Sequence, residues 1–116
     1  MGATIGTVIA GVNLLGTQLS ALSRNPVNPF SAADVPRLTN WAGAAVAVQN
    51  PYLLNLSGEG LVSPTAQSDL DACQTALDAI NQKLAKVIAG APPAGASSDG
   101  LINEARAAIS LAHGLY

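Results

Sequence analysis

The residues that could carry out acid–base or nucleophilic chemistry are few and stand far apart in the sequence. His113 is the sole histidine of the chain and Cys73 is its sole cysteine. A histidine near a helix end commonly interacts with the terminal carbonyls, and a thiol on an apolar helix face behaves as a small hydrophobic group. We therefore expect structural roles for both side chains, and neither a general base nor a Cys–His pair.

The acidic residues and the glycine-rich stretch also lack the patterns of a known site. Asp69 and Asp71 are expected to open a helix, where carboxylates interact favourably with the helix dipole. A zinc site needs a set of Cys and His ligands that this chain does not have. Gly58-Glu59-Gly60 lacks the lysine and the strand-to-helix context of a phosphate-binding loop. The sequence therefore predicts no enzyme activity, no metal, no cofactor and no small-molecule substrate.

The composition of the chain indicates a surface that something covers. Its 116 residues fit a single domain, 1–116, and 49% of them are apolar although only 3% are aromatic. Charged residues make up 10%, against about 25% in an ordinary soluble domain. Five scattered Lys and Arg residues and a net charge of −2 do not favour nucleic-acid binding. So few charges predict that copies of the chain, another protein or lipid cover much of the surface.

Four helical segments separated by residues that break helices are predicted, at about 3–24, 34–48, 63–89 and 98–115. The third follows Ser63-Pro64, a capping residue and a proline suited to the first turn. From Ala66 to Val87 its apolar or small residues recur in alternating steps of four and three, which is the spacing of helices that pack knobs into holes. We expect an all-α fold, a four-helix up-down bundle whose first and third helices are the long ones.

The polar residues beside the apolar positions of the third segment are expected to form a solvated face. They are Gln67, Asp71, Gln74, Asp78, Asn81 and Gln82. The second segment is expected to start with Asp34 as its cap and to end before Pro51. A long apolar loop should then join the second helix to the third, and it could form a small hairpin or a flap over the end of the bundle. Its apolar side chains are a predicted contact site for a partner: Tyr52, Leu53, Leu54 and Leu56.

The N-terminal segment contains no charged side chain before Arg24. It is about long enough to cross a membrane, but six polar side chains interrupt it. A signal peptide would begin with basic residues, which this segment lacks. Between Ile5 and Leu22 its apolar residues instead step by three and four, and polar residues from Asn13 to Arg24 lie on another face. This pattern favours a helix of a bundle over a helix surrounded by lipid.

Small residues follow one side of this N-terminal segment. Glycine in a helix interior costs about 0.5 to 1 kcal/mol relative to alanine, so the glycines call for a compensating close contact. Gly2 and Gly6 form a small-x-x-x-small pair of the kind that lets two helix backbones approach. We therefore predict an interface between helices, within one chain or between subunits, along Gly2, Gly6, Asn13, Gly16 and Ser20.

Taken together, these patterns predict a non-catalytic structural or assembly subunit. It would self-associate as a homo-oligomer, or dock on other structural proteins in a multi-copy particle such as a virion or a tail. The alternative is a small helical protein associated with a membrane or a lipid through its uncharged N-terminal helix.

Overall fold

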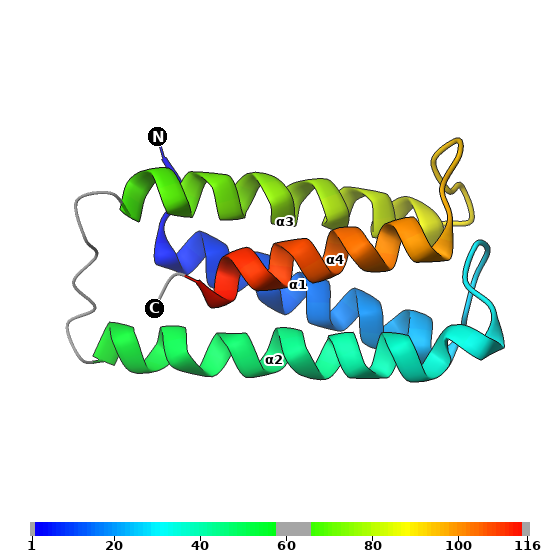
Figure 1. Ribbon diagram of the computed structural model, residues 1–116, viewed down its shortest axis with the longest axis horizontal. Coiled ribbons are helices and arrows are strands. Elements are labelled where there is room, and N and C mark those ends of the chain that lie inside the picture. Colours follow the sequence, from blue (N-terminus) through cyan, green and yellow to red (C-terminus); the bar gives the residue numbers. More distant parts are fainter. Residues whose placement is uncertain (1, 58–65, 115–116) are drawn as a thin grey trace.

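The computed structural model of the chain describes residues 2–57 and 66–114, with the backbone alone described at positions 50–57 and 66. Within these residues the protein is all-helical, with four α-helices and no strand, which confirms the predicted class. The helices lie side by side along the long axis of a molecule that measures 42 by 24 by 19 Å. The start of α1 and the end of α4 lie toward the same end of this axis (Figure 1).

The helices are α1, Ile5–Arg24; α2, Val35–Ser57; α3, Ala66–Ile88; and α4, Ser98–His113. A short 3-10 helix, Ala32–Asp34, leads directly into α2. Positions 63–65, where the third predicted helix was expected to begin, lie outside the described residues. The pattern of apolar spacing thus located all four helices, while the largest difference concerns the end of α2.

Local hydrogen bonds explain where α1 and α4 begin. The hydroxyl of Thr4 accepts a hydrogen bond from the backbone N–H of Thr7 at 3.1 Å, and the hydroxyl of Thr7 accepts one from the N–H of Thr4 at 2.9 Å. This reciprocal pair satisfies two backbone donors that the first turn leaves free. At α4 the hydroxyl of Ser97 accepts from the N–H of Gly100 at 3.1 Å. Side chains adjacent in the sequence therefore set both starts.

The predicted end of the second helix at residue 48 is wrong, because α2 continues through Pro51 to Ser57. A proline removes one helical hydrogen bond and crowds the preceding turn, but its fixed φ angle is itself compatible with a helix. The leucine-containing stretch after it has good helix propensity. Positions 52–56 are thus helical rather than part of a hairpin, and the rest of the predicted loop, 58–62, lies outside the described residues.

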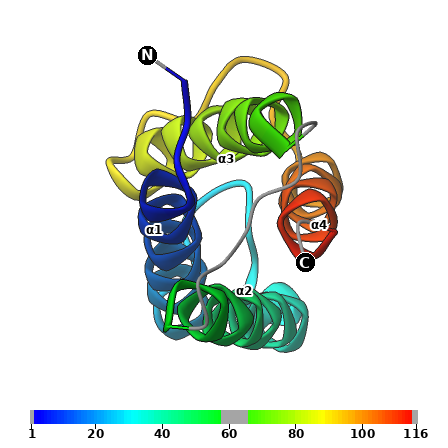
Figure 2. The same ribbon diagram turned by 90° about the vertical axis from the view of Figure 1, so that its left-hand side faces the viewer.

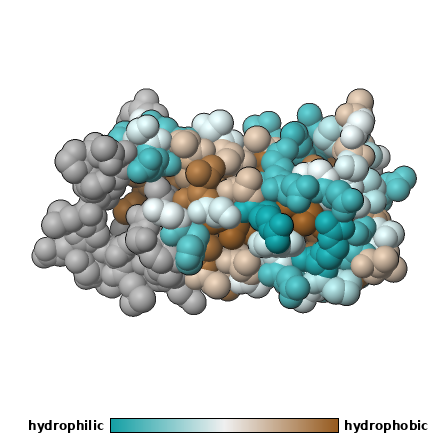
Figure 3. Space-filling view, viewed as in Figure 1, coloured by the Kyte–Doolittle hydropathy of each residue, from teal (hydrophilic) through white to brown (hydrophobic). Residues whose placement is uncertain are grey.

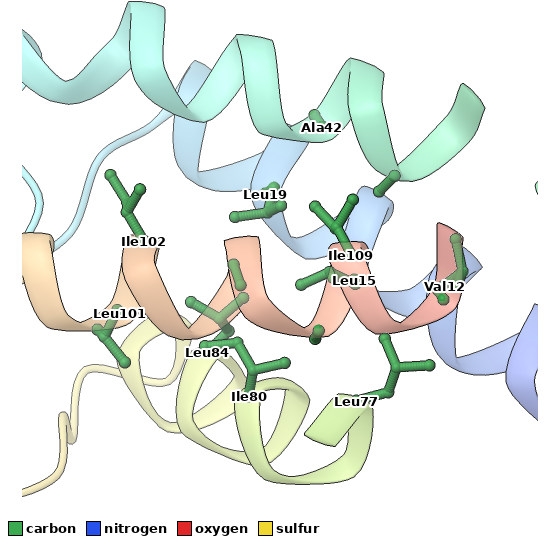
Figure 4. Packing of buried hydrophobic residues seen from close by; sticks show 14 of the residues in the cluster. Val12, Leu15, Leu19, Ala42, Leu77, Ile80, Leu84, Leu101, Ile102 and Ile109 are labelled. Carbon is green, nitrogen blue, oxygen red and sulfur yellow. The ribbon is translucent and has the colours of Figure 1, made fainter. Parts of the chain in front are cut away.

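The core is built from the apolar seams that the sequence pattern predicts. In α1 the side chains from Val8 to Leu22 at steps of three and four are at most 1% exposed. In α3 the corresponding positions from Leu70 to Val87 are at most 5% exposed. Side chains of α2 and α4 meet these seams in the centre of the molecule (Figure 4). Alanines on the buried face of α4, with Leu101, Ile102 and Ile109, complete the core.

Each helix packs against two neighbours, as the view down the bundle shows (Figure 2). Helix α1 contacts α2 and α3, and α4 contacts α3 and α2. Two glycines of α1 lie at these contacts. A Cβ atom added at Gly16 would lie 3.6 Å from the Cγ2 atom of Val46 in α2, and one added at Gly11 would lie 3.1 Å from the Cδ1 atom of Leu77 in α3. The close approach expected of the glycines is therefore partly used inside the chain.

A buried polar contact joins α1 to α3. The side-chain amide of Gln18 donates to the Oδ1 atom of Asn81 at 3.0 Å and to its backbone carbonyl at 3.1 Å. The amide of Asn81 donates in turn to the carbonyl of Gly11 at 3.0 Å. The prediction that Asn81 faces solvent is wrong, since it is only 4% exposed. A carboxamide both donates and accepts, so it can satisfy two groups of α1 at once.

Candidate interaction surface

The charged residues are divided unequally between the two halves of the bundle. Helices α1 and α2, 20 and 23 residues long, contain only two charged side chains, Arg24 and Arg37. Helices α3 and α4, 23 and 16 residues long, contain eight. These eight are Asp69, Asp71, Asp78, Lys83, Lys86, Asp99, Glu104 and Arg106. The difference lies on the outer surface, because the cores of both halves are apolar.

The side of α1 that faces away from the core carries a second row of residues at steps of three and four, here called the outer seam. It consists of Thr7, Ala10, Leu14, Thr17, Ala21 and Arg24. Leu14 is 49% exposed, and every other residue of the outer seam is exposed or half-buried. Apart from Arg24 the outer seam is uncharged, and apart from Arg24 and Leu14 its side chains are small. Such a surface offers close contact and no charge that water must keep solvated.

Beside the outer seam, a shallow groove of about 530 Å³ lies between α1 and α2. It is larger than a second hollow, of about 370 Å³, between α2 and α4. The groove is lined by Ser20, Ser23, Arg24, Thr39, Ala42, Gly43 and Val46. The hydroxyls of Ser23 and Thr39 share a hydrogen bond of 2.6 Å across it. Val46 is 53% exposed, and a Cβ atom added at Gly43 would meet nothing within 4 Å. The groove therefore has room for a further side chain.

The predicted interface residues of the N-terminal segment do not form one continuous surface. Gly6 and Asn13 are exposed, Ser20 is half-buried at the groove, and Gly16 is buried against α2. Gly2 precedes α1, and a Cβ atom added there would collide with the side chain of Gln67. Within α1, exposure thus leaves Gly6, Asn13 and Ser20 for a partner, and Gly2, which precedes the helix, is exposed as well. The outer seam itself was missed, although its spacing can be found in the sequence.

The contact residues that were predicted to lie in a loop belong to the last turns of α2. Tyr52, Leu53, Leu54 and Leu56 belong to the part of α2 for which the backbone alone is described. Their contact with a partner stays a prediction. What the structure changes is their setting, which is a helix end rather than a hairpin.

Several charges of α3 and α4 are paired. Lys83 of α3 and Glu104 of α4 form an ion pair at 2.6 Å, and Asp99 of α4 pairs with Arg37 of α2 at 2.7 Å. The hydrogen bond with Asp99 raises the pKa of Arg37 above its ordinary value. Figure 3 shows hydrophilic residues gathered toward the end of the molecule where α4 begins. These ion pairs lie at contacts between helices: Lys83 with Glu104 joins α3 to α4, and Arg37 with Asp99 joins α2 to α4.

The two side chains that could take part in catalysis, Cys73 and His113, have surroundings that suit structural roles. Cys73 is completely buried on the core face of α3, and burial raises the pKa of its thiol to about 11. A thiol, unlike a thiolate, is a poor nucleophile. His113 is exposed in the last turn of α4, next to a hollow of about 350 Å³ lined mainly by apolar residues of α2 and α4. Among the described residues no three His, Cys, Asp or Glu side chains come together as a metal site would need.

Helix α1 is long and apolar enough to cross a membrane, judged by length and composition. However, 44% of the relevant stretch is buried inside the molecule. A core helix of a bundle and a leader near the N-terminus meet the same criterion, so this property does not select one setting for α1.

Comparison with protein-family models, with curated proteins and with solved structures finds no match to this chain. Its function is therefore inferred from the surface that its own residues make.

Proposed function

We propose that the chain is a non-catalytic assembly subunit, an up-down four-helix bundle that binds copies of itself through the uncharged outer surface of α1. Two observations support the bundle topology. The helices contact one another in a closed ring, α1 with α2 and α3, and α4 with α3 and α2. In Figure 1 the sequence colours run in opposite directions along consecutive helices.

The observation that carries the proposal is the difference between the outer sides of α1 and α3. Both helices bury a seam of the same spacing, yet α3 has five charged residues and α1 has one, at its last position. Exposed charges keep soluble proteins hydrated and apart, and their loss promotes association. The outer seam of α1 lacks them over five of its six positions. Contact with another copy, or with a neighbouring structural protein of a multi-copy particle such as a virion or tail, explains this absence.

The size of the protein in solution tests self-association. We expect light scattering to report an oligomer whose mass does not change when a mild detergent is added above its micelle concentration. A monomer at concentrations of tens of micromolar, with and without detergent, contradicts the proposal.

A matched pair of variants locates the interface. Ala10→Glu with Thr17→Glu places two carboxylates on the outer seam of α1, two turns apart. Ala72→Glu with Ala79→Glu places two at the same spacing on the exposed side of α3. Both pairs change the net charge by −2 and neither enters the core. The α1 variant should weaken association by at least about 100-fold, because desolvating two carboxylates at an interface costs several kcal/mol, while the α3 variant should associate normally. Equal behaviour of the two variants would rule out α1 as the interface.

The second candidate function is association with a membrane or a lipid through α1. The length of α1 favours it, since 20 helical residues extend about 30 Å, the thickness of the hydrocarbon layer. Flotation with vesicles of phosphatidylcholine and phosphatidylglycerol separates the two candidates. A monomer that floats with the vesicles, and loses this binding when residues 1–24 are removed by a protease, favours the lipid candidate.

A further inference from the structure

The outer seam of α1 is nearly symmetric about its leucine. Its positions are 7, 10, 14, 17, 21 and 24. When a second α1 runs antiparallel to the first, with Leu14 opposite itself, Ala10 lies opposite Thr17 and Thr7 lies opposite Ala21. The largest apolar side chain of the outer seam, 49% exposed, would then meet its own copy at the centre, with small residues on either side. This arrangement is the self-complementary contact that a twofold axis requires.

Opposite charges stand near the two ends of α1. Arg24 is its last residue, and within the described residues its only recorded hydrogen bond is a long one, 3.4 Å from Nε to the carbonyl of Ser20. At the other end Asp71 of α3 reaches over the start of α1, where its Oδ1 atom accepts from the backbone N–H of Ala3 at 2.7 Å and from the amide of Gln67 at 3.0 Å. Its Oδ2 atom has no recorded partner among the described residues.

An antiparallel arrangement brings these charges together. With Leu14 opposite itself, Arg24 of one copy lies beside Thr4 of the other, and Asp71 is bonded to the neighbouring residue, Ala3. The twofold axis makes the contact occur twice, once at each end. A parallel pair would instead place arginine against arginine and aspartate against aspartate, which repel each other.

We propose that two copies of the chain pair side by side and antiparallel through the outer seam of α1, with Leu14 on the twofold axis and Arg24 of each copy facing the partner's Asp71. This inference rests on the proposed function, self-association through α1, and adds its geometry. The small side chains of the outer seam allow the two helix axes to approach closely, since the distance between packed helices depends on the side chains at the contact.

The dimensions of the molecule favour a side-by-side contact over an end-to-end one. A stable interface buries about 800 Å² per partner. The ends of the molecule, 24 by 19 Å, offer only about 460 Å². A long side, 42 Å by 19 to 24 Å, offers about 800 to 1,000 Å². Only a long side, such as the one that α1 occupies, is large enough.

Disulfide cross-linking tests the orientation. In a Cys73→Ala background, one protein carries Thr7→Cys and a second, with an added tag that changes its mass, carries Ala21→Cys. Antiparallel pairing predicts that oxidation of the mixture yields the mixed dimer. Each protein alone should give no cross-link, because in a dimer of identical copies the introduced thiol of one copy would lie about 21 Å, or fourteen residues along the helix, from that of the other. Cα atoms joined by a disulfide are at most about 7 Å apart. Cross-linking of each protein with itself, and not of the mixture, would overturn the antiparallel pairing.

Charge reversal tests the pairing of Arg24 with Asp71. Arg24→Glu and Asp71→Lys should each weaken dimerisation by about tenfold, because two contacts per dimer become repulsive. The double variant should recover most of the loss. Lys86→Glu is the control, since it makes the same charge change as Arg24→Glu at an exposed position of α3. A double variant as weak as the sum of the single ones would overturn the pairing.

The outcomes distinguish the two proposals. A monomeric protein removes the proposed function and this inference together. A detergent-independent oligomer that cross-links in the parallel pattern, or that ignores charge reversal, removes only the antiparallel geometry and leaves self-association in place.

Discussion

The helices α1 and α3 have similar core-facing sides and different solvent-facing sides. Both bury an apolar row at steps of three and four, built from Val and Leu in α1 and from Leu, Ile, Val and Cys73 in α3, and both rows are at most 5% exposed from Val8 and from Leu70 onward. Outside, α3 carries five charged residues, whereas α1 carries uncharged and mostly small ones up to Arg24.

This comparison shows that a buried seam does not demand an uncharged helix. A helix needs an apolar stripe on the core side only, and the opposite side is usually polar. Helix α3 follows this rule, so the absence of charge on α1 is a property of its outer surface and not a by-product of packing.

The largest expected effect is on the buried polar contact between α1 and α3. Asn81→Leu should lower the free energy of unfolding by about 3 kcal/mol, because in a buried site it removes one of the two acceptors of the Gln18 amide and the side-chain donor to the carbonyl of Gly11. The double variant Gln18→Leu with Asn81→Leu should recover part of this loss. Urea unfolding measures both values. A cost below about 1 kcal/mol for the single variant would contradict the structure of this contact.

The free energy of unfolding should depend on pH through Cys73, on the core face of α3. The pKa of Cys73 rises from 9.0 to about 11 on folding, so the folded chain holds the thiol proton more tightly than the unfolded chain does. The resulting stability is complete below about pH 9 and is lost as the pH rises through 11. Between these values the native protein should lose about 2 kcal/mol more than a Cys73→Ala variant. The difference between the two unfolding curves cancels lysine and tyrosine titration, and parallel curves would contradict the burial of this thiol.

Close packing of α1 against α3 should make Gly11 intolerant of a side chain. A Cβ atom there would lie 3.1 Å from Cδ1 and 3.3 Å from Cβ of Leu77, and the latter atom cannot move without the α3 backbone. Gly11→Ala should therefore lower the free energy of unfolding by about 1 to 2 kcal/mol despite its better helix propensity. Thermal unfolding followed by circular dichroism measures the change, and a stabilised variant would show that α1 and α3 are not this close.

The smallest effect, with the opposite sign, is expected on the outer surface of α2. A Cβ atom at Gly43 would meet nothing within 4 Å, so Gly43→Ala should raise the free energy of unfolding by about 0.5 to 1 kcal/mol. The same unfolding measurement checks it, and Gly11→Ala is its matched counterpart. If both variants lost stability equally, the contrast between the inner and outer glycines would disappear.

Local sequence features determined the helices and their buried faces. The steps of three and four from Val8 to Leu22 and from Leu70 to Val87 predicted both seams, because side chains at these intervals lie on one side of a helix whatever surrounds it. The scarcity of charge, which carries the functional proposal, is likewise a property of the sequence alone. The outer seam of α1 has the same spacing, but only the knowledge of which side is buried separates it from the core.

The tertiary structure decided what each face meets. Asn81 looks like a surface residue in the sequence, and it is buried because Gln18 and Gly11 of another helix satisfy its amide and carbonyl. Gly16 looks available for a second subunit, and α2 occupies the space beside it. Helical spacing reports the angular position of a side chain on its own helix, whereas burial depends on neighbours that are distant in the sequence. For that reason the sequence could predict the helices of this protein but could not tell which of its small-residue faces stays open to a partner.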